Sequence, residues 1–352
     1  MNKIIQSIPL LLCIAVFVAC QQEESLPGGN DKMVTLTLNI GTQTTGVSTR
    51  EDDPNVRPYE GIRTLRALVI SDATDPKDRK ILYNEKHVID GNTSPTSATL
   101  SASLTLENIP VGKASIYLIA NEESIGTEYT NDKLTSQEYI NDSKLLLLDE
   151  DWTHFPKRYK EIAEHGLPMS GKAEGIEITS DMQAISIKLE RTVVKLHLTI
   201  ENATSKELTL EWVKFGSFIS DRVFLFRQSQ LDIPESTKYT DLRYPKTDLR
   251  YPKGEAETLN VVLAASAETD WQPVYIYPNF AYKNPTGANP YTLSLATSNK
   301  VYSPSLIGSN INSMVRNTQF NILARITASA TINILYSFVP WEENEVNVPS
   351  FN

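Results

Sequence analysis

The sequence predicts an all-β protein made of two antiparallel β-sandwiches in tandem. Segments in which apolar and polar residues alternate recur between Met33 and Val339, and this period of two is typical of strands with one buried face. Clusters of Gly, Pro, Asn and Asp separate these segments, as in a chain of hairpins. A length of 352 residues gives room for two ordinary domains.

The N-terminus has the features of a secretory signal. A short basic start at Lys3 precedes a mostly apolar run, and small Ala19 comes before Cys20. Residues 17–20, Phe-Val-Ala-Cys, resemble a bacterial lipobox, although Phe17 stands where an aliphatic residue is usual. We therefore expect residues 1–19 to be a signal peptide and Cys20 to be lipidated; an ordinary signal peptide with an incidental cysteine is the alternative. Residues 20–50 would comprise a lipid tether and a removable first strand.

That first strand is expected at residues 33–40, where four apolar residues alternate with polar ones: Val34, Leu36, Leu38 and Ile40. The polar run 41–53 that follows has no apolar period and is predicted to be an exposed loop. A protease could cut this loop between Arg50 and Glu51. Removal of the strand from a sandwich would leave an apolar groove with unpaired backbone groups, and a subunit built in this way polymerises.

The rest of the first sandwich, residues 51–180, is expected to contain four strands with a short helical insertion. The strands are predicted at 59–71, 80–84, 99–106 and 114–121, the helices at 135–148 and 152–166, and a loop at 166–171.

The second sandwich is expected to span residues 181–352. Its strands are predicted at 181–200, 208–218, 257–264, 273–278, 291–296, 320–327 and 331–339. A heptapeptide, Thr-Asp-Leu-Arg-Tyr-Pro-Lys, occurs twice in succession at 240–246 and 247–253. Two copies cannot build a solenoid. The polar residues and the two prolines of the duplication predict an exposed loop, where an insertion costs little.

No arrangement of residues predicts catalysis, a metal site or a cofactor. The four histidines, His87, His154, His165 and His197, lack the spacing of metal ligands, and no nucleophile motif or phosphate-binding loop is present. Cys13 lies within the expected signal peptide, which leaves no thiol for a disulfide or a metal. The net charge of −10 argues against a nucleic-acid partner. The four tryptophans are expected in cores rather than in a sugar-stacking platform.

Several segments in shared order resemble the Bacteroidota fimbrillins, the type V pilins. They are the lipobox, Ile62–Ile70, Ile116–Asn121, Leu167–Gly171, Glu190–Lys195 and Val339–Trp341. The resemblance implies two transthyretin-like β-sandwiches in a subunit that is exported as a lipoprotein, held at the outer membrane by its lipid during export, and located at the cell surface in fimbriae. It also implies cleavage by an Arg-specific protease, here at Arg50–Glu51, and assembly with other fimbrial subunits by donor-strand exchange, in support of adhesion to a host or bacterial surface receptor.

The candidate donor strand lies at the C-terminus. Its apolar residues are Ile332, Ile334, Tyr336 and Phe338, followed by Val346 and Val348. This region is either a donor or the end of the last strand. The subunit is either a stalk or a tip, or an anchor that is not cleaved. A surface lipoprotein that binds glycans through Tyr239, Tyr244 and Tyr251 remains the alternative of a different class.

Overall fold

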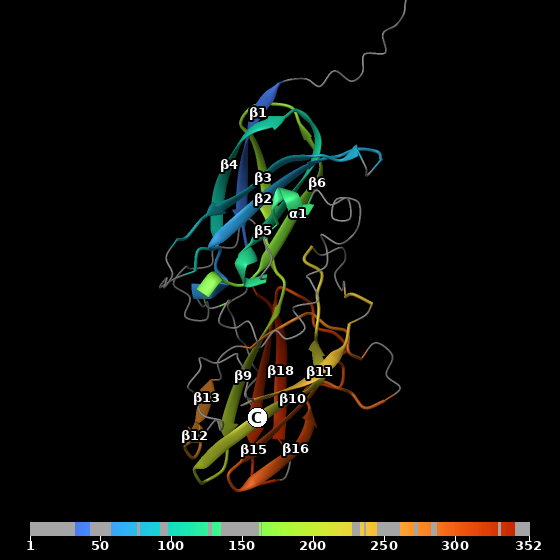
Figure 1. Ribbon diagram of the computed structural model, residues 1–352. Helices are drawn as coiled ribbons and strands as arrows, with labels where there is room; N and C mark the ends of the chain where they lie inside the picture. Colours follow the sequence, from blue (N-terminus) through green and yellow to red (C-terminus); the bar gives the residue numbers. More distant parts are fainter. Residues whose placement is uncertain are drawn as a thin grey trace, which may run out of the picture.

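The computed structural model shows an all-β protein with two β-sandwiches arranged end to end (Figure 1). It describes residues 32–42, 58–75, 78–91, 98–125, 129–134, 162, 164–226, 233–235, 237–244, 261–270, 274–282, 287–329 and 332–341.

The N-terminal sandwich consists of two sheets that pack face to face. The smaller sheet has the order β4-β1-β7, with β1 Met33–Gly41, β4 Ser101–Pro110 and β7 Gln183–Lys188. The larger has the order β3-β2-β5-β6-β8, with β2 Thr64–Ser71, β3 Ile81–Val88, β5 Gly112–Ala120, β6 Met169–Ile178 and β8 Glu190–Arg191. Apolar side chains from both sheets form one continuous core.

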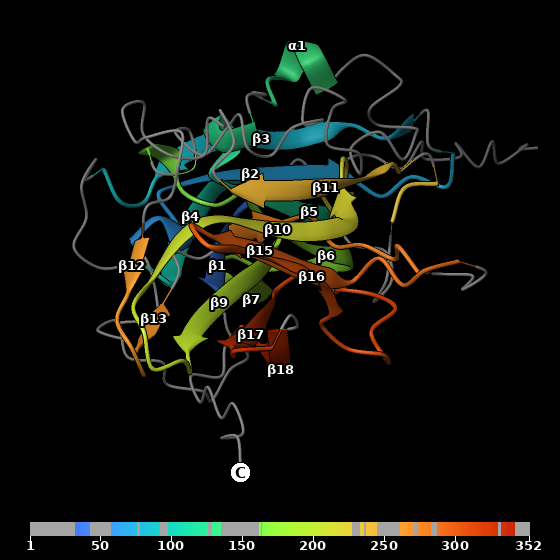
Figure 2. The same cartoon turned by 90° about the horizontal axis from the view of Figure 1, so that it is seen from below.

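The C-terminal sandwich is built in the same way (Figure 2). One sheet has the order β13-β9-β17-β18 with β14 also on β9, where β9 is Val194–Asn202, β13 Glu268–Asp270, β14 Val274–Ile276, β17 Thr318–Ile326 and β18 Ile332–Pro340. The other has the order β11-β10-β15-β16 with β12 also on β10, where β10 is Leu208–Ser220, β11 Tyr239–Tyr244, β12 Val261–Leu263, β15 Thr292–Thr297 and β16 Lys300–Leu306. A second core fills the space between them.

A third apolar cluster joins the two sandwiches. Strand β2 contributes to this cluster because it is an almost uninterrupted apolar run whose side chains are buried on both faces of the sheet. Leu65 points into the N-terminal core, whereas Leu68 and Ile70 point outward and pack in a cluster that also contains Phe226 and Trp341. The two sandwiches therefore share a buried contact.

The boundary between the sandwiches differs from the predicted one at 180/181. Strand β7 pairs with β1, and β8 pairs with β6, so both belong to the N-terminal sandwich. The C-terminal sandwich begins with β9 at Val194. The prediction was wrong because β7 and β9 have the same alternating pattern, which reports a half-buried strand but not the sheet that it joins.

Two segments predicted as loops are strands. Strand β6 starts at Met169, inside the expected loop 166–171. The first copy of the heptapeptide lies largely in β11, which pairs with β10, and its Leu242 is buried. The second copy lies outside the described residues.

Helix is scarce in the part of the chain that the structure describes. It comprises the 3₁₀ turns Pro58–Glu60 (η1) and Glu122–Ile125 (η3), the four-residue helix α1 Asn131–Leu134, and a few helical residues before Gly166. The helix predicted at 135–148 lies outside the described residues. None of the described helices has the length and apolar character needed to cross a membrane.

Candidate functional site

Strand β1 is the centre of the candidate site, and its four apolar side chains are almost completely buried. Val34 and Ile40 are 3% exposed, and Leu36 and Leu38 are 0% exposed. The intervening side chains at 35, 37 and 39 are half-buried or exposed. The alternation read from the sequence therefore corresponds to one face directed into the N-terminal core.

Hydrogen-bonded neighbours flank β1 on both sides. It pairs antiparallel with β4 from Met33↔Pro110 to Gly41↔Ser101, with a register shift between Val34 and Leu36. It pairs parallel with β7 from Leu36↔Gln183 to Gly41↔Lys188. Among the described strands, β4 and β7 each pair only with β1. Without β1 the small sheet would consist of two separate strands, each with one unpaired edge facing the gap.

Loop residues extend this pairing beyond the ladder. The Thr35 amide donates a hydrogen bond of 2.7 Å to Oδ1 of Asp181, and the Met182 amide donates one of 2.7 Å to the Thr35 carbonyl. At the other end of β1, the Leu189 amide donates to the Gly41 carbonyl at 2.8 Å. The backbone hydrogen bond from Thr35 lowers the pKa of the Asp181 carboxyl. Sequence reasoning missed Asp181, since an exposed Asp before a strand is an ordinary turn residue.

The covalent connection of β1 to the rest of the protein runs through residues outside the described range. The description ends at Thr42 and resumes at Pro58, so the predicted cleavage residues Arg50 and Glu51 lie between these points. The predicted lipidation site Cys20 also lies outside the described residues. A single cut between 43 and 57 would leave β1 attached to the core by non-covalent contacts alone.

The burial of β1 has a substantial energy. Each fully buried Val, Leu or Ile side chain contributes about 1.5–3 kcal/mol, so four contribute roughly 6–12 kcal/mol before ordering costs. A strand with this gross burial energy is held firmly in its sheet.

The predicted donor residues occupy the C-terminal sandwich of the same chain. Strand β18 pairs with β17 at nine positions, from Thr318↔Pro340 to Ile326↔Ile332. The Phe338 ring stacks on Phe320 at 4.2 Å, and Ile332 is 4% exposed, whereas Phe338 is 40% exposed. These residues, with Ile334 and Tyr336 between them, form the edge strand of their sheet. Val346 and Val348 lie outside the described residues.

A buried ionic cluster lies where the two sandwiches meet. Glu60 of η1 is 0% exposed, and its Oε1 accepts a 2.5 Å hydrogen bond from the Tyr275 hydroxyl and lies 2.9 Å from Nζ of Lys195. Nε1 of Trp341 donates to Oε2 of Glu60 at 3.3 Å, and the Trp341 ring lies under the Arg191 guanidinium. Glu60 thus connects η1 to Trp341, which directly follows β18.

The other singled-out residues do not converge. Trp341 packs in the core as expected, while Trp212 is half-buried beneath Arg243. Tyr239 is half-buried, and its hydroxyl accepts a hydrogen bond from the Phe280 amide. The Tyr244 side chain and Tyr251 lie outside the described residues. Among the residues that the structure describes, no group of three or more His, Cys, Asp or Glu is placed to hold a metal ion.

Comparison with known proteins identifies the fold. The chain is similar to the tip fimbrial protein Mfa3 of Porphyromonas gingivalis in a C-terminally truncated form, with 16% identity, a TM-score of 0.53, and coverage of 88% of this chain and 100% of that one. It is also similar to the fimbrilin FimA of P. gingivalis, with 15% identity, a TM-score of 0.50, and coverage of 87% and 97%. No protein-family model and no curated protein matches the sequence. The fimbrillin-like fold expected from the sequence is therefore confirmed.

Proposed function

We propose that the chain is a structural subunit of surface fimbriae, of the stalk or tip type, that assembles by donor-strand exchange and supports adhesion. The observation that carries this proposal is the position of β1: a strand with a fully buried apolar face, hydrogen-bonded on both sides, whose connection to the rest of the chain passes through the predicted cleavage site. The role is structural and adhesive rather than catalytic, and no cofactor takes part.

The proposed pathway begins with export as a lipoprotein that is attached to the outer membrane through Cys20. An Arg-specific protease then cuts at Arg50–Glu51, and β1 leaves with the lipid anchor. Its departure exposes an apolar groove bounded by the free edges of β4 and β7, and such edges are templates for a strand from another chain. A neighbouring subunit supplies the replacement strand.

The C-terminal region supplies that strand in our proposal. Strand β18 is an edge strand with half-exposed side chains, so it can leave its sheet at lower cost than β1 could. Its alternating apolar residues match the period of β1, and Val346 and Val348 continue the pattern beyond it. The two sandwiches are of the transthyretin-like type in this proposal, as the resemblance of the sequence to the fimbrillins implies.

The test uses the purified precursor and an Arg-specific protease. Cleavage is expected to release a fragment ending at Arg50, to leave a subunit beginning at Glu51, and to give a ladder of oligomers on unheated SDS gels. The variant Arg50→Gln is the matched control, because it removes the cut without touching the described fold. N-terminal sequencing and mass spectrometry identify the fragments.

Two results would count against the proposal. A processed subunit that remains monomeric after β1 has left would show that the groove recruits no neighbour. Surface material that still carries a lipid-blocked Cys20 would instead identify an anchor that is not cleaved.

A further inference from the structure

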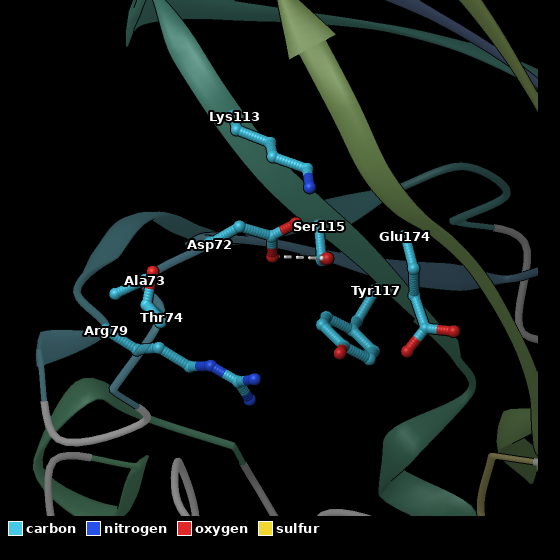
Figure 3. A pocket seen from close by; sticks show the side chains of 8 residues that line it. All are labelled: Asp72, Ala73, Thr74, Arg79, Lys113, Ser115, Tyr117 and Glu174. Carbon is cyan, nitrogen blue, oxygen red and sulfur yellow. Dashed lines mark hydrogen bonds between the residues drawn. The ribbon is translucent and has the colours of Figure 1, made fainter.

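A polar cavity opens on the N-terminal sandwich, away from β1. It has a volume of about 390 Å³ and lies where the end of β2, the β2–β3 hairpin, β5 and β6 come together (Figure 3). Cavities of roughly 300–1,000 Å³ are typical of small-molecule sites. The side chains around it come from β5, β6 and the described part of the connection between β2 and β3.

Both carboxylates at the cavity already have partners within the protein. Oδ1 of Asp72 accepts a hydrogen bond of 2.8 Å from the Ser115 hydroxyl, and Oε2 of Glu174 lies 2.9 Å from Nζ of Lys172. Their negative charge is therefore partly compensated by neighbouring donors. Each carboxylate retains lone pairs that can accept hydrogen bonds from hydroxyl groups of a ligand.

The two cationic side chains at the cavity, Arg79 and Lys113, are not paired with the carboxylates beside them. The Arg79 side chain extends into the open space, and the Lys113 ammonium faces it from the opposite side (Figure 3). Nε of Arg79 is buried and has no hydrogen-bond partner. In the described part of the chain, neither cation forms an ion pair with the nearby carboxylates. The terminal nitrogens of the Arg79 guanidinium, unlike Nε, lie beside the open space, where an anionic ligand can accept hydrogen bonds from them (Figure 3).

An aromatic side chain completes the cavity. The Tyr117 ring forms part of the lining and packs against Phe226 in a T-shaped contact, with the two ring centroids 5.2 Å apart. Burial raises the pKa of the Tyr117 phenol, so the hydroxyl stays protonated at neutral pH. The cavity thus combines a rigid aromatic surface, two cationic donors and two carboxylate acceptors.

We propose that this cavity binds a carboxylate-bearing sugar, one acidic residue of a glycan. The sugar carboxylate would lie between Arg79 and Lys113, since a guanidinium is suited to bidentate contact with a carboxylate. Its hydroxyl groups would donate to Asp72, and its apolar face would lie against Tyr117. This inference does not rest on the assembly role, because the cavity is separate from β1 and is complete in the uncut chain.

The experiment is a titration of the full uncut chain with sugars, in which binding is measured by calorimetry and by ligand-observed NMR. The probes are D-glucuronic acid and N-acetylneuraminic acid, with D-glucose and N-acetylglucosamine as neutral counterparts and acetate as a simple anion. We expect at least one acidic sugar to bind about tenfold or more tightly than both its neutral counterparts and acetate, because a charged hydrogen-bonded pair has this magnitude.

Variants locate the site. Arg79→Gln and Lys113→Gln are each expected to weaken binding of the acidic sugar about tenfold or more, while Lys206→Gln, an exposed lysine of the other sandwich, leaves it unchanged. Thermal unfolding of each variant confirms that the fold is retained. Absence of binding by both acidic sugars, equal affinity for acetate, equal affinity for the neutral sugars, or binding unaffected by Arg79→Gln would each overturn the proposal.

Discussion

The substitution Leu38→Ala gives a direct test of how strongly β1 is held. Leu38 is 0% exposed and lies between Leu104 of β4 and Ile185 of β7. Truncation of a buried Leu to Ala costs about 2–5 kcal/mol, through lost burial and the cavity that remains. In the uncut chain we expect the free energy of unfolding, measured by urea denaturation, to fall by this amount.

The same substitution has a second effect after cleavage. Once the segment 43–57 is cut, β1 is a separate ligand of the groove, and the same 2–5 kcal/mol weakens its binding by roughly 30- to 4,000-fold. We expect the fragment to be released faster than from the unsubstituted protein. Size-exclusion chromatography and mass spectrometry measure this release. Strand exchange with a neighbouring subunit should accelerate with it.

Asn39→Ala is the matched control for this test. Asn39 is the next residue of the same strand, but its side chain is exposed on the opposite face. A surface substitution of this kind changes stability by about 0.5 kcal/mol or less. If Leu38→Ala and Asn39→Ala have equal effects on unfolding and on release of the fragment, β1 is not a buried strand whose hydrophobic face holds it, and the reasoning fails.

Three further predictions concern the surroundings of β1 and the contact between the sandwiches. Glu60→Gln is expected to destabilise the protein by about 3–5 kcal/mol, because it removes the counter-charge of a buried lysine; calorimetry that gives an unchanged melting temperature would contradict this. Gly171→Ala is expected to destabilise β6, since a Cβ at this position would lie 2.3 Å from the backbone carbonyl oxygen of Lys188; an unaltered urea midpoint would refute the clash. The Asp181 carboxylate accepts from the Thr35 amide and has a lowered pKa, so its contribution is present above the unfolded-state pKa of about 3.9 and is lost as the pH falls through the lowered folded-state value. Retention of β1 after cleavage, measured from pH 6 to pH 2, should therefore decline at acid pH, and this component of the decline should be absent in Asp181→Asn.

The elements that could be predicted are those in which one local pattern decides the structure. In β1, four apolar residues at a spacing of two have a single arrangement that buries them all, and the structure has that arrangement. The apolar run of β2 likewise indicates a strand covered on both faces, and β2 is covered by the core on one face and by the third apolar cluster, which holds residues of both sandwiches, on the other. For such segments the local sequence pattern is sufficient to predict the strand and its buried faces.

The features that were missed depend on contacts between distant segments. Strand β7 was assigned to the wrong sandwich because its partner β1 lies about 150 residues earlier in the chain, and no local pattern reports a parallel pairing of that kind. Strand β11 was read as a loop because its Asp, Arg and Tyr residues look solvated, yet its backbone pairs with β10. No sequence pattern around Glu60 indicated that its side chain is buried. Its burial is created by Lys195, Tyr275 and Trp341, which are 135 to 281 residues away in sequence.

The position of β1 between two neighbours has a mechanical consequence. In the fibre that we propose, tension on each joint would act along the axis of the strand that occupies this position. Because that strand is bonded on both sides over most of its length, the load is shared by both rows of hydrogen bonds at once, and they must break together. A strand at the edge of a sheet, loaded at one end, would instead unzip one bond at a time. A joint at the β1 position therefore resists shear by its geometry.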